Sequence, residues 1–283
     1  MSTATLPGTD LLEARLALLS SAGLSAVELG AGVETDTNGV EALALRSGLP
    51  TVIHNYFPPP AHDFVLNLAS GDSGIAEASV SMVKKALAIS AELGAPYYSV
   101  HAGFITDPGS FDGTSFRFPD PSSPQCREDA LSRFAERLRE CLAEASACGV
   151  QLLIENNVCP SHLAGKLLLV CPEDVAEIWG LVGNSDLGML LDTGHLLVSA
   201  ATHGYAPDEF VSAASSVVSA FHLHENDGVA DRHEPARIGG WAVTAIGTAP
   251  FDTLPVTVEA KFADVTSLAA YVGELQANFR QSL

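Results

Sequence analysis

The segment LGMLLDTGH (residues 187–195) joins an apolar run of strand length to two residues that can bind metals, Asp192 and His195. Five more segments pair an apolar run with a carboxylate or imidazole: TVIHN (51–55), YYSVHAG (97–103), LLIENN (152–157), AFHLHEND (220–227) and PVTVEAK (255–261). One such residue at the mouth of a buried strand is ordinary. Six in chain order indicate strands of one parallel sheet that deliver their side chains to the same end.

The apolar runs are nearly continuous rather than alternating, which is typical of a parallel sheet covered on both faces. AVELG (26–30) predicts one further strand, and STATL at the N-terminus could supply an eighth. Helix signals separate the strands, with Asp10 as a candidate N-cap and glycines at several helix ends. The predicted helices cover 10–22, 39–47, 74–93, 127–148, 172–182, 207–215 and 264–280.

Alternating strands and helices over 283 residues predict a (β/α)8 TIM barrel with outer helices, formed by residues 1–283 as one domain. An open doubly wound sheet is the alternative, but such a sheet concentrates its site at one switch point. Here the ligand-type residues come from at least six strand ends. Two connections, at about 55–73 and 102–124, are longer than a barrel needs, and we expect them to cover the site.

The chain carries a formal net charge of −20, with 34 acidic and 14 basic residues. Such a surface repels phosphate polyanions, so a nucleic-acid partner is disfavoured. No apolar run reaches the length of a membrane span, and the N-terminus lacks the pattern of a signal peptide. Five cysteines without CxxC spacing then favour reduced thiols. We therefore expect a cytoplasmic protein without membrane contact.

Three carboxylates end buried runs: Glu155 after LLI, Asp192 after MLL and Glu259 after VTV. Each alone could cap the next helix or form a local salt bridge. Together at one barrel mouth they would repel one another, and a divalent cation would remove that repulsion. With His222 as a fourth ligand, the mixed oxygen and nitrogen set suits Mn, Mg, Co or Zn.

The order E-N, D-T-G-H, H-x-H-x-N-D-G with D-x-H, and a late V-E resembles the xylose-isomerase-like TIM-barrel superfamily. This superfamily includes sugar isomerases and epimerases, and endonuclease IV is related to it. The resemblance runs from about His54 to Lys261. It implies one divalent metal, held as in the epimerases by Glu155, Asp192, His222 and Glu259. It also implies that Glu155 and Glu259 act as catalytic acid and base on opposite sides of the substrate.

This mechanism is chemically reasonable for these residues. Removing a proton next to a carbonyl creates an enediolate, whose charge a metal stabilises. One carboxylate takes the proton and a second group returns it. The sequence therefore predicts a metal-dependent isomerase or epimerase of a sugar, cyclitol or related keto-polyol. A dehydratase would use the same enolisation.

The first alternative is a multinuclear-zinc phosphodiesterase of the endonuclease IV type. That resemblance implies nine ligands to three zinc ions, and the chain has a candidate for each. Besides the four named above they are His54, His101, His195, Asp231 and His233, which could equally bind substrate. Two features oppose this alternative, namely the IHNYFPPP segment around His54 and the acidic loop that follows AVELG. A second alternative is a barrel that binds metal or sugar without turnover.

Three basic residues lie near the ligand positions, namely Arg232, Arg237 and Lys261. They could bind a substrate carboxylate or phosphate, or merely balance nearby acidic residues. His224 follows His222 on the same predicted strand, and we expect its side chain to point to the opposite face and to pack or form a supporting hydrogen bond. Resemblance alone suggests a homo-oligomer.

Overall fold

The computed structural model describes residues 1–6, 11–30, 48–60, 62, 64–111 and 116–281. The predicted cap at Asp10, the predicted helix 39–47 and most of the acidic loop after AVELG lie outside these residues. Among the helices in the described ranges, none combines the length and the hydropathy of a membrane span.

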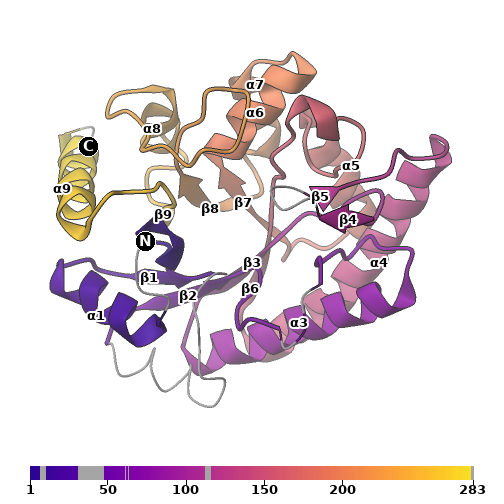
Figure 1. Cartoon of the computed structure of the whole chain (residues 1–283), viewed down its shortest axis with the longest axis horizontal. Helices are drawn as coiled ribbons and strands as arrows, with labels where there is room; N and C mark the ends of the chain where they lie inside the picture. The colour runs from indigo at the N-terminus through magenta and orange to yellow at the C-terminus, as the bar shows by residue number, and fades with distance from the viewer. Residues whose placement is uncertain (7–10, 31–47, 61, 63, 112–115, 282–283) are drawn as a thin grey trace.

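Seven parallel strands follow one another around the sheet in chain order. Helices surround this sheet (Figure 1), and the predicted TIM-barrel fold is confirmed. The strands are β1 (Val27–Leu29), β2 (Thr51–His54), β3 (Tyr97–His101), β6 (Gln151–Glu155), β7 (Gly188–Asp192), β8 (Val218–Leu223) and β9 (Val256–Val258). The helices are α1 (Leu12–Ser21), α3 (Ser73–Glu92), α4 (Gln125–Cys148), α5 (Pro172–Val182), α6 (Thr193–His203), α7 (Pro207–Ala214), α8 (Trp241–Ile246) and α9 (Val265–Gln281).

The N-terminal segment closes the ring between the first and last strands. Ser2 forms a parallel bridge with Glu28 of β1, and its N–H donates to the carbonyl of Val258 in β9 over 3.2 Å. STATL is therefore not a full eighth strand, because Thr3–Thr5 turn into a 3-10 helix directly after this bridge. The closure excludes an open sheet, whose edge strands would not be joined.

The barrel interior has an apolar layer directly beneath the predicted ligands. Tyr97, Leu153, Leu190 and Ala220 pack together there, with Val52 beside them. Since strand side chains alternate between faces, the next inward position on most of these strands carries a ligand candidate. Residues of the other face join the larger core against the helices. Two buried layers explain why the strands read as continuous apolar runs.

The two long connections contact each other through Asn67. Its amide nitrogen donates to the Phe104 carbonyl over 3.1 Å and to Asp107 Oδ1 over 2.8 Å. Its side-chain oxygen accepts from the Phe104 N–H over 2.9 Å. The second connection also contains a short antiparallel pair, β4 (Ser110–Phe111) and β5 (Phe116–Arg117). These bonds fix the two connections relative to each other after strands β2 and β3.

Candidate metal centre

Four predicted ligands gather at the carboxyl end of the barrel, and we call them the inner group: Glu155, Asp192, His222 and Glu259. Their ligand atoms all lie within 4.8 Å of one another. The strand register brings them together, because Asp192 pairs with His222 across β7 and β8. Three of the four side chains have no solvent exposure, and Glu259 is 13% exposed.

Several polar atoms of the inner group have no hydrogen-bond partner among the described residues. These atoms are the two carboxylate oxygens of Glu155 and the ring nitrogen Nδ1 of His222. His222 Nδ1 lies 3.1 Å from Glu259 Oε2 and 3.3 Å from Glu155 Oε1. Buried polar atoms without partners are costly. Oxygen and imidazole donors that converge on one point therefore fit a divalent cation, which these four residues would hold.

The other five predicted ligands surround the inner group, and we call them the outer ring: His54, His101, His195, Asp231 and His233. Glu155 connects several of them to the inner group. Its Oε2 lies 3.3 Å from His54 Nε2 and 3.5 Å from His101 Nδ1, whereas its Oε1 lies 3.4 Å from His195 Nδ1. The structure thus brings all nine predicted ligands into one cluster.

Asp231 and His233 enter the cluster from the loop after β8. Asp231 Oδ2 lies 3.0 Å from His233 Nε2 and 3.5 Å from His195 Nε2. Asn226 fixes this loop, because its side-chain oxygen accepts from the His233 N–H over 3.2 Å. Both loop residues are partly exposed, at 26% and 21%, so this side of the cluster opens to solvent.

Supporting residues that sequence reasoning missed hold the ligands in place. Glu28 Oε2 lies 2.9 Å from His222 Nε2. Asn156 forms two hydrogen bonds with the backbone of Asp192, of 2.8 and 3.0 Å. The sequence held a signal for Glu28, a single charge inside the apolar strand AVELG.

His224 does not point away from the ligands, contrary to the expectation from the sequence. Its Nε2 lies 2.9 Å from Asp192 Oδ2, and its ring stacks on His233 with centroids 4.4 Å apart. The expectation was wrong because residues two positions apart in a strand share a face, so the ring of His224 lies on the same side as that of His222. Gly194 gives the ring its space, since a Cβ there would lie 2.1 Å from the ring carbon Cε1. The supporting hydrogen bond expected of His224 is present.

In the described part of the chain, no side-chain hydrogen bond or ion pair joins the three basic residues to the nine clustered ligands. Arg232 is 54% exposed and pairs with Asp227 over 2.8 Å. Arg237 and Lys261 are exposed, and their backbone N–H groups donate to Glu225 and His233. Their predicted role in substrate binding stays a prediction.

The cluster is electrostatically balanced by its imidazoles. Burial alone would raise the pKa of Glu155, but His101, His54 and His222 lower it well below its usual range. Burial lowers the pKa of His222, but Glu28, Glu259 and Glu155 together raise it well above its usual value. His101 behaves differently, because burial dominates and lowers its pKa to about 4. Protons on imidazoles thus neutralise carboxylates where a cation would otherwise do so.

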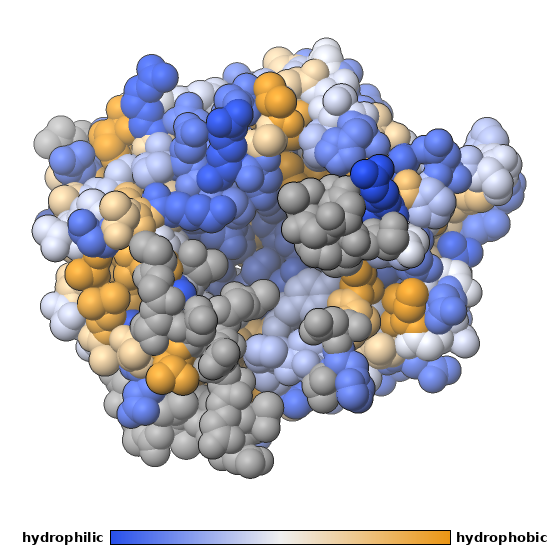
Figure 2. All heavy atoms as spheres, in the orientation of Figure 1, coloured by the Kyte–Doolittle hydropathy of each residue, from blue (hydrophilic) through white to orange (hydrophobic). Residues whose placement is uncertain are grey.

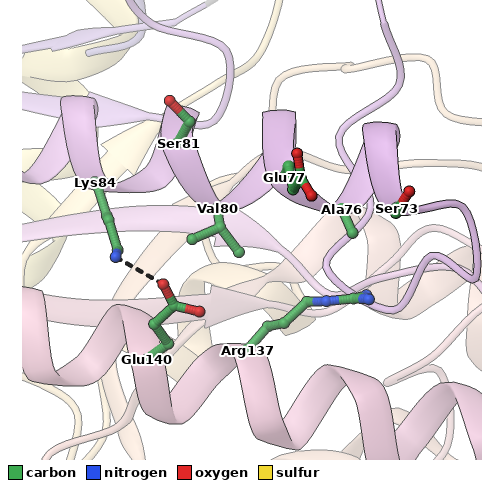
Figure 3. A pocket seen from close by; sticks show the side chains of 8 residues that line it. All are labelled: Ser73, Ala76, Glu77, Val80, Ser81, Lys84, Arg137 and Glu140. Atoms are coloured by element: carbon green, nitrogen blue, oxygen red, sulfur yellow. Dashed lines mark hydrogen bonds and ion pairs between the residues drawn. The ribbon is translucent and has the colours of Figure 1, made fainter.

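Polar side chains also gather at the surface. Figure 2 shows a hollow near the centre of one face, with hydrophilic residues around it. A separate groove of about 470 Å³ lies on the outside, between α3 and α4 (Figure 3). Lys84 and Glu140 pair across it over 2.7 Å. No member of the inner group or outer ring lines this groove, so it is not part of the candidate centre.

Residues 16–260 match the family described as Xylose isomerase-like TIM barrel. The chain belongs to this family. A D-tagatose 3-epimerase-like protein shares the fold with a TM-score of 0.71 and 18% identity, over 98% of each chain. The TTHB071 protein of Thermus thermophilus, from a crystal soaked with ZnCl2, gives a TM-score of 0.63 and 21% identity over 96% of this chain and 97% of that one.

A curated relative, Probable endonuclease 4 from Carboxydothermus hydrogenoformans, is 29% identical over 163 residues. The match covers 57% of this chain and 49% of the relative. This chain therefore aligns with about half the length of that relative. Both sides of the sequence resemblance, to epimerases and to endonuclease IV, thus have a counterpart among known proteins.

Proposed function

We propose that this protein is a metal-dependent isomerase or epimerase of a sugar, cyclitol or related keto-polyol. The observation that carries the proposal is the inner group, in which two glutamates, an aspartate and a histidine converge within 4.8 Å at the open end of the barrel. The D-tagatose 3-epimerase-like protein with the same fold agrees with it. Carbohydrate metabolism would be the corresponding cellular role.

A bound divalent cation would supply Lewis-acid stabilisation of the negative charge that enolisation creates. Glu259 is the better placed base, because its side chain is 13% exposed whereas that of Glu155 is wholly buried. Glu259 would take the proton from the carbon next to the carbonyl, leaving an enediolate. Glu155 would return a proton on the other side, and because its own pKa is low, it would first receive that proton from the protonated ring of His195, whose Nδ1 lies 3.4 Å from Glu155 Oε1. Glu259 would then lose its proton to solvent, and His195 would regain one.

The outer ring would orient the substrate hydroxyls. His101 is 26% exposed, and its low pKa keeps the ring neutral, so one nitrogen can donate and the other accept. Asp231 and His233, on the open side, can bind further hydroxyls. The three basic residues remain candidates for a substrate carboxylate or phosphate.

Solvent exchange tests the proposal. The protein is loaded in turn with Mn, Mg, Co and Zn and incubated in D2O with a panel of ketoses and keto-cyclitols. Deuterium should enter at the carbon next to the carbonyl, and Glu259→Gln should abolish this while retaining the metal. Loaded, folded protein that exchanges no proton of any panel member would contradict the proposal.

A multinuclear-zinc phosphodiesterase is the second candidate. The observation that favours it is that the donors form overlapping sets around Glu155, including one with His54 and His222 and one with His101 and His195. A further set, His224 with Asp231 and His233, does not include Glu155 but is joined to the others by the set of Asp192, His195 and His224. Close to three zinc ions per chain, together with cleavage of DNA at abasic sites, would establish this candidate instead.

A barrel that binds metal or sugar without turnover would bind the ligand but exchange no proton. The single-domain organisation, a cytoplasmic location, the absence of a nucleic-acid partner and a homo-oligomeric state stay predictions. The charge of −20 supports the expectation about nucleic acid.

A further inference from the structure

Glu28 is a fully buried carboxylate inside the barrel. It lies on β1 between Val27 and Leu29, and both neighbours belong to the core that packs against the helices. Alternation along the strand therefore directs Glu28 toward the barrel interior. Its exposed fraction is 0%. A carboxylate at this depth is costly unless a partner stabilises it, so its contacts indicate its role.

The partner of Glu28 is His222 of the inner group. Glu28 Oε2 lies 2.9 Å from His222 Nε2, and both side chains are wholly buried. The second oxygen, Oε1, has no hydrogen-bond partner among the described residues. The contact with His222 is therefore the interaction that stabilises the Glu28 carboxylate at this position.

This contact determines which ring nitrogen of His222 carries hydrogen. An ionised carboxylate only accepts hydrogen bonds, so Nε2 must donate. In the neutral ring the lone pair then lies on Nδ1. That nitrogen faces Glu259 and Glu155 at 3.1 and 3.3 Å, and a ring that binds a cation there must have released its Nδ1 proton. A lone pair directed at two carboxylates is favourable only with a cation between them.

Without Glu28 the ring has an alternative. Hydrogen on Nδ1 could then bond to the carboxylates of Glu259 or Glu155, and the donor set would lose its nitrogen ligand. Carboxylates that hold metal-binding histidines in one tautomer are a general feature of metal sites. Glu28 occupies this position on the side of the ring opposite the donors.

We propose that Glu28 is the positioning residue that makes Nδ1 of His222 the ligand atom of the metal centre. It acts through His222 and touches neither the substrate nor the cation. The inference rests on the metal centre of the proposed function, and it applies equally to the isomerase and the phosphodiesterase.

Titration of the metal-free protein with Co²⁺, followed by visible absorption, tests the role of Glu28. Glu28→Leu removes the acceptor and should raise the Kd by about 10–100-fold. Glu28→Gln keeps an acceptor oxygen in the same shape and should restore part of the affinity. Thr257→Val is the matched control, because Thr257 is a buried polar residue that pairs with His222 across β8 and β9. It should bind Co²⁺ like the wild type.

Folded Glu28→Leu protein with wild-type affinity would overturn the inference while leaving the metal centre intact. Equal losses in Thr257→Val would also overturn it, since the effect would then be one of general packing. A wild type that binds no Co²⁺ would refute the metal centre itself, and the inference with it.

Nitrogen-15 NMR of the zinc-loaded wild type tests the inference without any substitution of Glu28. The His222 ring, assigned by the signal lost in His222→Asn, should carry hydrogen on Nε2 and none on Nδ1. Hydrogen on Nδ1 would overturn the inference.

Discussion

The inner group and the outer ring differ in how far their polar atoms are already paired. In the inner group, both Glu155 oxygens and Nδ1 of His222 lack hydrogen-bond partners among the described residues. In the outer ring, His54 Nδ1 lies 3.0 Å from Ser99 Oγ, and Asp231 Oδ2 lies 3.0 Å from His233 Nε2. The inner group therefore offers more unpaired ligand atoms to a cation, although Nδ1 of His233 in the outer ring also lacks a partner among the described residues. This difference supports the proposal that a metal binds in the inner group, with the outer ring left for substrate or further metals.

The largest effect is expected from Glu155→Gln. The amide keeps the shape of the side chain but removes the charge and the proton-transfer group. Activity should fall by about 10²–10⁴-fold, as for loss of a general acid or base. Steady-state kinetics with metal analysis of the same sample checks this. Full activity would refute the acid/base assignment and the distinction between the inner group and the outer ring.

Metal affinity should depend strongly on pH because of the inner group. The pKa of His222 is raised well above its ordinary value, so the metal-free ring is protonated at neutral pH. A metal ligand must release that proton, and affinity should therefore rise with pH and fall as the medium becomes acidic. His101, whose pKa is about 4, contributes no such proton near neutrality.

Calorimetry in buffers of different ionisation enthalpy measures the protons released on binding. We expect protons to be released when the metal binds at pH 7, and a higher Kd at pH 6 than at pH 8. An affinity that stays constant over this range would contradict the proton balance described for His222.

A smaller effect is expected from Asp231→Asn in the outer ring. The change removes a charged partner of His195 and His233 on the open side of the cluster. Loss of such a charge-assisted bond corresponds to about tenfold in kcat/KM. Metal content should remain that of the wild type if the outer ring binds only substrate. A loss of zinc would instead place a second metal there.

The smallest effect is expected from Arg232→Ala. The side chain is exposed and already paired with Asp227, and such surface pairs contribute little. KM should stay within about twofold of the wild type. A tenfold rise in KM would show that Arg232 leaves Asp227 to bind the substrate.

The strand ends were predictable because parallel strands bring their carboxyl ends to one edge. His101 lies in register with Glu155, and Asp192 with His222, as the order of the segments implies. The period of the hydrophobic pattern and the apolar content of each segment suffice for such a prediction. They also give most helices, including α5, whose observed bounds are those predicted.

The supporting residues were harder to predict, since they depend on packing between segments far apart in the chain. Glu28 and His222 are separated by 194 positions, and no local pattern connects them. Helix α6 was missed because DTGH was interpreted only as ligands. Asp192 in fact has two roles, since its Oδ1 caps α6 by accepting from the His195 N–H over 2.7 Å, while Oδ2 faces the cluster. Helix-cap and metal-ligand roles are thus compatible in one residue.

The metal content of the purified protein tests the central claim most directly. Elemental analysis should find about one Mn, Mg or Co per chain, and substitution of His222 or Asp192 by alanine should remove it. Close to three zinc ions per chain would contradict the isomerase assignment. Protein that retains no divalent metal, even after loading, would refute the metal centre on which the account depends.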